Sequence, residues 1–565
     1  MQKLRKIIVF HILSIVALTL QAQEAAAPKW GSKAMKGIVE VLTYDKDSNL
    51  MKKGTGFYIN TEGVALADYN LFKDAYSAVV VNTSGEKSPV KWILGADDTY
   101  SLVKFKVNTK KNTALTIAES PSSENAMVFT LKYTNGKLSS CPSAQVSMVK
   151  KLGDNCPFYT LSFATDESYL GAPVFNAKGE LVGMTQPSMG NNGYALGIGY
   201  ADSISIKAIT TKVNTLALEK IHIAKGLPDN VSESLVYLYM KAPNMQNEEY
   251  LELLNLFVET YPDNAEGYFR RSSPLIELHR FDEADQDLQT YYKLSTDKAL
   301  ANTKIADIIN TKLVYQPEPP YEKWTFDLAL EHVDKALAEQ PDILEYKMLK
   351  GQILMAKKDF EGAIAQYESI LNSKDRSPDI YYIASLAHEG AGDSVSVQIE
   401  MIDSALAMFP TPMPAEAARY VLRRGQLQSA AGHYRDAVND YNQYCFLCNN
   451  KVNTSFYYDR AKLEEKARMY QQALDDLTTA INMSPQVAML YIEKCALLLK
   501  VNELDDCIKT ANQLLSIDPQ NVNALRILGY AQTQAGETAK GKANLQKAAD
   551  MGDESAKELL KTLDN

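Results

Sequence analysis

The sequence predicts a protein of two parts, an all-β part followed by an all-α part, and two observations carry that prediction. From about residue 33 to 205, short segments rich in β-branched and aromatic residues alternate with turn signals such as Asn-Gly and Lys-Gly. From about residue 230 to the end, apolar residues recur at helical spacing with a period near 34 residues. A chain of 565 residues is also too long for a single hydrophobic core.

Residues 1–22 have the features of a secretory signal peptide. Met1–Lys6 is basic, Ile7–Leu20 is an almost unbroken apolar run, and the following Gln21-Ala22 suits a cleavage site. We therefore expect an exported protein, located in the periplasm of a Gram-negative bacterium and without a membrane span after cleavage. The alternative is an uncleaved membrane anchor, which requires a longer apolar span of about 20 residues.

The composition gives a further expectation about partners. The formal net charge is −10, and 23% of the residues are charged. Because nucleic-acid-binding proteins normally present a basic face, we do not expect nucleic acid as a partner.

The predicted β domain covers residues 33–216. Its segments GIVEVLTY, GTGFYIN, SAVVVN, LVKFKV, AMVFTLKY, FYTLSF and YALGIGY are typical of short strands in a sandwich or barrel. The spacing becomes helical near residue 204, and Lys225-Gly-Leu-Pro228 interrupts it. We therefore expect a linker at 217–230 and a helical domain at 231–565.

Three blocks of the β domain resemble the trypsin-like serine proteases, in particular the HtrA-like (Deg-type) bacterial branch. The blocks are Gly54-Thr-Gly-Phe-Tyr-Ile-Asn through Asn70, Gly95-Ala-Asp-Asp through Ser101, and Ser168-Tyr-Leu-Gly-Ala-Pro173, where the family has G-N-S-G-G-P. The resemblance implies a trypsin-like double β-barrel. It also places the catalytic His, Asp and Ser slots on Asn70, Ser101 and Leu170.

These three residues predict a pseudoprotease that is not an enzyme. The amide of Asn70 is not a general base, Ser101 does not stabilise an imidazolium as a buried carboxylate does, and Leu170 carries no nucleophile. Moreover, the six histidines all lie outside residues 33–216, at positions 11, 222, 279, 332, 388 and 433.

A relocated serine site remains the alternative, namely an exported serine peptidase using a non-standard site. Ser168 lies two residues before the vacant serine slot, and Lys104 lies three residues after the vacant Asp slot. A Ser–Lys dyad requires a desolvated lysine, whereas Lys104 alternates with apolar residues and is expected to be exposed. The empty cleft either binds an extended peptide or is filled by Tyr169 and Leu170.

The helical part resembles the tetratricopeptide repeat family. Blocks such as MYQQALDDLTTAINMSP and ELDDCIKTANQLLSIDP recur with small residues at fixed positions, and Pro485 and Pro519 lie 34 residues apart. The resemblance implies an α-solenoid of helix pairs that approach closely at Gly351, Gly425 and Gly529. A terminal capping helix is expected at 555–563.

The solenoid is the predicted binding surface. First-helix positions of successive repeats supply a mixture of aromatic and basic residues suited to protein or peptide partners. These candidate binding residues are Arg419, Arg423, Tyr458, Arg526 and Tyr530. The sequence therefore predicts a non-enzymatic adaptor that binds proteins or peptides of the cell envelope, with the β domain as an accessory module.

The six cysteines suggest two disulfide candidates and no metal site. Cys141 and Cys156 flank a segment expected to be a hairpin, and an oxidising compartment permits a bridge between them. Cys495 and Cys507 are expected to face each other within one repeat, either bonded or as two buried thiols. Cys445 and Cys448 have no second ligand pair nearby, so we expect neither a metal nor another cofactor.

Overall fold

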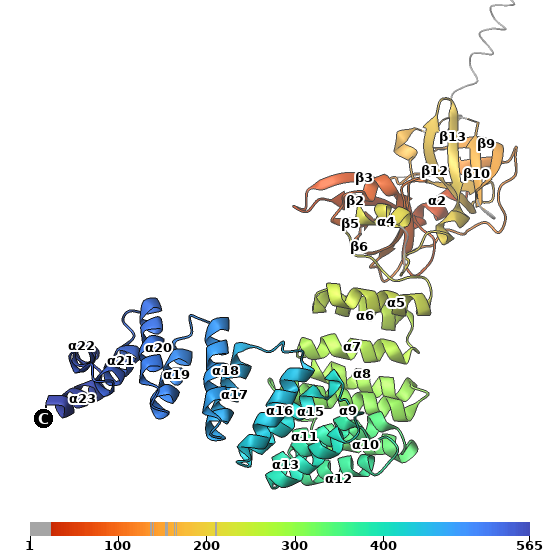
Figure 1. Cartoon of the computed structure of the whole chain (residues 1–565). Coiled ribbons are helices and arrows are strands. Elements are labelled where there is room, and N and C mark those ends of the chain that lie inside the picture. The colour runs from red at the N-terminus through yellow and green to blue at the C-terminus, as the bar shows by residue number, and fades with distance from the viewer. Residues whose placement is uncertain are drawn as a thin grey trace, which may run out of the picture. The chain divides into compact units, whose positions relative to one another are not determined.

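The computed structural model describes residues 24–135, 138, 140–152, 156–162, 164, 166–208 and 212–564. The chain divides into two compact units between Ser295 and Thr296. Unit 1 holds all the strands and helices α2 to α8, and unit 2 holds α9 to α23 (Figure 1). The predicted signal peptide, residues 1–22, lies outside the described residues. In the described part, no helix has both the length and the apolarity needed to cross a bilayer.

The first half of the β domain is a closed barrel of six strands in the order β2-β3-β4-β7-β6-β5. The strands are β2 (Ile38–Tyr44), β3 (Leu50–Tyr58), β4 (Val64–Asp68), β5 (Ser77–Val81), β6 (Lys87–Asp97) and β7 (Leu102–Val107). Apolar side chains at alternate positions, such as Val39 and Val41 of β2, fill the interior. The period-2 pattern of the sequence thus becomes the inward face of the barrel.

The second half is a ring of six strands to which β1 (Glu24–Ala26) adds beside β9. Pairing of β8 with β9 closes the order β9-β10-β13-β12-β11-β8. The strands are β8 (Met127–Thr130), β9 (Ser140–Leu152), β10 (Cys156–Leu161), β11 (Pro173–Asn176), β12 (Leu181–Met189) and β13 (Asn192–Gly197). The predicted double β-barrel is confirmed.

The segment predicted as a linker, 217–230, is packed against the first barrel instead. It begins in the last turn of α4 (Lys212–Glu219), and both Ile221 and Ile223 are buried in the core of that barrel. The amide of Gly226 donates to the carbonyl of Ile93 at 2.9 Å. The segment therefore runs along β6 and packs on the barrel through its alternating isoleucines. Its glycine and proline do not make it a free linker. We call it the packed return segment.

Four helices complete unit 1, and an apolar cluster joins the first two of them to the barrel. They are α5 (Val231–Lys241), α6 (Asn247–Thr260), α7 (Ala265–Glu277) and α8 (Phe281–Leu294). Trp92 of β6 and Leu227 lie in one buried cluster with Tyr237 and Leu238 of α5 and Leu253 of α6. Barrel and helices are therefore continuous within unit 1. Two short helices, α2 (Gly31–Ala34) and α3 (Tyr69–Phe72), belong to the β domain.

Unit 2 is entirely helical. Its helices are α9 (Lys298–Tyr315), α10 (Phe326–Glu339), α11 (Leu344–Lys357), α12 (Phe360–Leu371), α13 (Pro378–Ala391), α14 (Val395–Leu406), α15 (Ala418–Ala430), α16 (Tyr434–Leu447), α17 (Thr454–Lys466), α18 (Tyr470–Met483), α19 (Ala488–Lys500), α20 (Leu504–Ile517), α21 (Val522–Gln534), α22 (Thr538–Asp550) and α23 (Glu554–Asp564). The helices α17, α19 and α21 begin 34 residues apart, which confirms the predicted period.

The helices of a pair approach each other at glycines, as the sequence predicted. A Cβ atom on Gly351 would lie 2.4 Å from Cε1 of Tyr367, and one on Gly529 would lie 2.9 Å from the carbonyl oxygen of Gly541. Gly425 is similarly close to Tyr441. Because a Cβ essentially never comes nearer than about 3 Å to a backbone oxygen, the close packing of α21 on α22 depends on glycine.

Candidate functional site

The residues at two of the protease-like positions are joined by a hydrogen-bond network around Asp68. The amide of Asn70 donates to Oγ of Ser101 at 2.8 Å, and Ser101 Oγ donates to Oδ2 of Asp68 at 3.1 Å. The backbone N–H of Asn70 also donates to Asp68 Oδ1 at 2.7 Å. Pairing of β4 with β7 sets this geometry, since Asp68 lies opposite Leu102. The sequence indicated the slots at positions 70 and 101, but it gave no signal for Asp68.

Asp68 is the buried charge of this network. Only 4% of its surface and 5% of that of Ser101 are exposed. Burial raises the pKa of Asp68 above its ordinary value, whereas the hydrogen bonds from Asn70 and Ser101 act in the opposite direction. Asp68 caps the short helix α3, so this carboxylate is used to hold the backbone around Asn70.

Leu170 lies beside the same network. The next residue, Gly171, has a φ of 72° and approaches Asp68 so closely that a Cβ there would lie 2.8 Å from the Asp68 backbone nitrogen. The fold therefore brings the three protease-like positions together around Asp68. Their chemistry is amide, hydroxyl and hydrocarbon, and no imidazole lies among them.

The backbone amides around Leu170 already have acceptors within the chain. In an acyl-transfer site of this fold, the N–H groups of the serine position and of the residue two before it bind the oxyanion. Here those groups belong to Leu170 and Ser168, which donate to the carbonyl of Glu167 at 3.1 Å and to Oδ1 of Asp166 at 2.8 Å. The short 3₁₀ turn Glu167–Tyr169 thus occupies both donors.

Ser168 contacts a lysine, but not the one that the sequence suggested. Lys104 is only 8% exposed, and its ammonium donates to the carbonyl of Ala201 at 3.1 Å, so the prediction that it is exposed is wrong. Instead, Nζ of Lys132 lies 2.5 Å from Oγ of Ser168 and 4.3 Å from the centre of the Tyr169 ring. Ser168 is exposed and Lys132 is half-exposed, whereas a serine–lysine catalytic pair requires a desolvated lysine.

The predicted binding residues of unit 2 lie on the first helices of their pairs. Arg419 and Arg423 lie one turn apart on α15, where Arg419 pairs with Asp379 and Arg423 donates to Oε2 of Glu389 at 2.8 Å. Tyr458 of α17 is half-buried, and burial raises its pKa above the ordinary value. These three residues therefore already make contacts within the solenoid.

Arg526 and Tyr530 line a common groove of about 470 Å³. The other lining residues come from α19, α21 and α23, and they are Leu499, Ile527, Ser555, Glu558, Leu559 and Thr562. Arg526 also pairs with Asp553 at 3.2 Å, and Tyr530 is 36% exposed. Of the five candidates, Arg526 and Tyr530 lie together in this groove.

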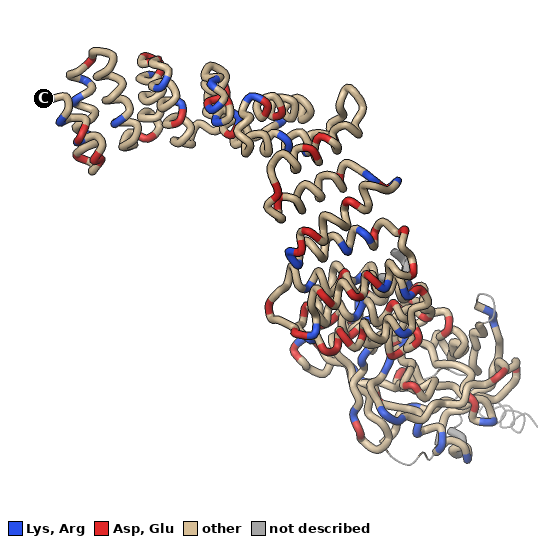
Figure 2. Tube along the Cα trace, turned by 90° about the horizontal axis from the view of Figure 1, so that it is seen from below, with Lys and Arg blue, Asp and Glu red and all other residues tan. Residues whose placement is uncertain are grey.

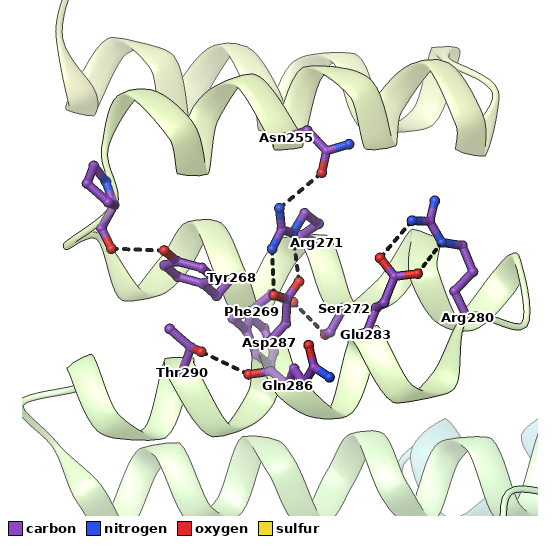
Figure 3. A network of polar contacts seen from close by, with 11 residues as sticks. Asn255, Tyr268, Phe269, Arg271, Ser272, Arg280, Glu283, Gln286, Asp287 and Thr290 are labelled. Atoms are coloured by element: carbon purple, nitrogen blue, oxygen red, sulfur yellow. Dashed lines mark hydrogen bonds and ion pairs between the residues drawn. The ribbon is translucent and has the colours of Figure 1, made fainter.

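A set of half-buried arginines, each paired with a buried aspartate, was not predicted from the sequence. Arg271 of α7 donates from Nη1 to Oδ1 of Asn255 on α6 at 3.0 Å, and it forms a bidentate pair with Asp287 of α8 (Figure 3). Asp287 is 4% exposed, and burial raises its pKa above the ordinary value. We call such a residue, which bridges three successive helices, an arginine clamp.

Two further clamps follow the same design in unit 2. Arg424 and Arg460 form bidentate pairs with Asp440 and Asp476, each 16 residues later, as Asp287 is from Arg271. Their remaining nitrogen donates to the helix before, to Asp403 and Asn442 respectively. The sequence did carry a signal for these clamps, namely an Arg followed 16 residues later by an Asp. This spacing places the two residues on the two helices of one repeat.

All six cysteines are free thiols in the structure. Cys156 lies opposite Leu152 at the end of β9, whereas Cys141 lies eleven residues earlier in that strand and opposite Ala25, and the suggested bridge is not formed. Cys495 and Cys507 do face each other, since each Sγ lies 3.7–3.8 Å from the other residue's carbonyl oxygen. They pack as two small buried side chains between α19 and α20.

Charges of both signs are interspersed along the helices and strands of both units (Figure 2). Among the described residues, no group of three or more His, Cys, Asp or Glu side chains lies close enough to hold a metal ion.

The architecture defines the class of protein, a trypsin-like peptidase domain followed by tetratricopeptide repeats. The family model described as trypsin-like peptidase domain matches residues 54–184, and the model described as tetratricopeptide repeat matches residues 325–379. The first match contains positions 70, 101 and 170, and the second contains Gly351.

Individual proteins similar to this chain share between 21% and 24% of the aligned residues with it. The chain is 24% identical over 286 residues to the DnaJ protein P58IPK homolog of Arabidopsis thaliana, covering 50% of this chain and 54% of the relative. It is 21% identical over 311 residues to DnaJ homolog subfamily C member 7 of Mus musculus (46% and 62%), and 22% identical over 303 residues to Superkiller complex protein 3 of Homo sapiens (52% and 18%). The chain spans 54–66% of the length of the DnaJ protein P58IPK homologs.

Proposed function

We propose that this protein is a non-enzymatic adaptor that binds proteins or peptides through its repeat solenoid. The observation that carries the proposal is the groove in which Arg526 and Tyr530 lie together, because aromatic and arginine side chains beside an apolar floor are the usual anchors of protein interfaces. One similar protein, which is by its name a member of the Superkiller complex, supports an interaction role.

The β domain acts in this proposal as a pseudoprotease. Asn70, Ser101 and Leu170 supply no general base, imidazolium partner or nucleophile. The engaged amides of Ser168 and Leu170 support the same role, since oxyanion donors would have to break existing hydrogen bonds. The domain then serves as a structural or accessory binding module.

The proposed location is the periplasm of a Gram-negative bacterium, with partners in the cell envelope. The basic start, the apolar run and the small residues within positions 1–22 support export. An exported adaptor would meet partners during or after their own translocation.

Capture from a cell-envelope extract tests the adaptor. Full-length protein is expected to retain specific proteins, and R526A/Y530A is expected to retain at least fivefold less of them, because both changes remove groove contacts. K509A alters an exposed ion pair on α20 outside the groove and should match the wild type. Equal capture by R526A/Y530A and wild type would show that the groove does not bind the partners.

The second candidate function is a serine peptidase that uses Ser168, which the 2.5 Å contact with Lys132 favours. A fluorophosphonate probe reacts covalently with activated serines and separates the two functions. We expect no labelling of the full-length protein under conditions that label trypsin, because Lys132 is half-exposed and the local amides are engaged. Labelling that S168A abolishes would instead establish the peptidase.

A further inference from the structure

Two adjoining cavities lie in unit 1 where the barrel meets α5 and α6. Their volumes are about 440 and 500 Å³, which is the size of small-molecule sites. Both are lined by Lys225 of the packed return segment and by Tyr237, Lys241 and Asn244 of α5 and the turn after it. These four residues therefore form the centre of one elongated site.

The walls on either side of this centre are largely apolar. Trp92, Met245 and Leu253 line the larger cavity, and Ile206, Leu218 and Met240 line the smaller one. Trp92, Tyr237 and Leu253 also belong to the buried cluster that joins barrel and helices. A ligand in the site would thus lie on rigid, packed side chains.

The centre carries two cations, Lys225 and Lys241. In the described part of the chain, no carboxylate lies within ion-pair distance of Nζ of either lysine. Lys225 donates to the carbonyl of Ile223 at 2.7 Å and to that of Ile221, which leaves its third N–H without an acceptor among the described residues. Lys241 lies over the ring of Tyr237 at 5.3 Å.

The acids nearby do not cancel these charges. Glu252 is engaged by Lys91 at 2.9 Å, and Glu219 and Glu249, which also line the cavities, are exposed. Burial, and then the proximity of Lys241, lower the pKa of Lys225 to about 8. A bound anion would relieve the repulsion between the two ammonium groups.

We propose that this junction binds a carboxylate attached to an apolar body, with the carboxylate between Lys225 and Lys241 and the apolar body against Trp92 or Ile206. Asn244 supplies a further amide donor beside the lysines. Two sources share this chemistry, a free aliphatic acid and the C-terminus of an apolar peptide. The residues of this site belong to unit 1 and those of the solenoid groove to unit 2, so this proposal does not rest on the adaptor function.

Isothermal titration of the full-length protein at pH 7 tests the proposal with matched pairs of probes. Octanoate is compared with 1-octanol, and the acetylated tripeptide Gly-Leu-Phe with a free carboxylate is compared with its amide. We expect one acid of the two pairs to bind at a single site at least tenfold more tightly than its uncharged counterpart. The pair that shows the difference identifies the source of the carboxylate.

The variants assign the binding to the site. K241M is expected to weaken binding of the acid at least tenfold, because it removes a half-exposed charge without disturbing a packed group. K225M should do the same, and near-ultraviolet circular dichroism verifies that it folds. K220M is the matched control, since Lys220 is exposed on the same segment but lines neither cavity. Equal binding of acid and neutral probe, no acid binding at millimolar concentration, or an equal loss in K220M would overturn the proposal.

Discussion

Replacing Arg424 by methionine is expected to destabilise α14, α15 and α16 by about 3–5 kcal/mol, the range found when one partner of a buried ion pair is removed. Arg424 donates to Asp440 of α16 at 2.6 Å and to Asp403 of α14 at 2.8 Å. Asp440 is 5% exposed, and burial already raises its pKa, so the variant would leave a poorly solvated carboxylate without its counter-charge.

Hydrogen exchange of amides in α14–α16, measured by mass spectrometry on the full-length protein, reports this loss locally. The double variant R424M/D440L should recover much of the stability, because an apolar pair of similar size has no charge to desolvate. K509A removes an exposed ion pair and should leave protection in α14–α16 unchanged, because solvent screens such a pair. If R424M lost no more protection than K509A, the arginine clamp would not stabilise these helices.

Glu464 is expected to make the stability of α17 depend on pH in an unusual direction. Burial, and then the nearby Asp476, raise its pKa to about 8 from the ordinary 4.5, although Arg460 acts in the opposite direction. The folded state therefore holds a proton that the unfolded state has released between pH 4.5 and 8. This contribution to stability is complete below pH 4.5 and is lost as the pH rises to 8.

The variant E464Q should remove this pH dependence, because glutamine keeps the shape and carries no charge. Between pH 5 and 8 we expect the wild type to lose on the order of 3 kcal/mol of local stability relative to E464Q. Hydrogen exchange of α17 and α18, corrected for the intrinsic pH effect, measures the difference.

The neighbouring Glu465 provides a control of opposite sign. Its burial is outweighed by hydrogen bonds from Lys500 and Lys462, which lower its pKa, so it stabilises the folded state above its ordinary pKa. E465Q should therefore lose stability at pH 7. A wild type whose stability does not fall relative to E464Q between pH 5 and 8 would contradict the buried, protonated state of Glu464.

The architecture was predictable because it rests on periodicity. Alternation in the β segments and the 34-residue period each repeat many times, so single irregular positions do not obscure them. Gly351, Gly425 and Gly529 were predictable for the same reason, since close helix contacts recur at one repeat position. The proximity of positions 70, 101 and 170 was predictable because each lies in a local motif that resembles the trypsin-like fold.

Features that depend on one tertiary contact were not predictable. Lys104 follows an alternating pattern, yet it is buried because the carbonyl of Ala201 accepts its ammonium. Ile221 and Ile223 lie between the end of α4 and the Gly226–Pro228 turn, and only the barrel beside them explains their burial. The network around Asp68 and the cavity around Lys225 and Lys241 were not predictable for the same reason. Both are formed by elements that are distant in the sequence.

The short turn Glu167–Tyr169 limits what side-chain substitution alone could add to the β domain. Installing His, Asp and Ser by N70H, S101D and L170S would supply the side chains of a protease but leave the amides of Ser168 and Leu170 bound to Asp166 and Glu167. It would also bring a new carboxylate at position 101 against the buried Asp68. Catalysis would thus require a different backbone course as well as three substitutions, so amino-acid changes made one at a time would not be expected to produce it.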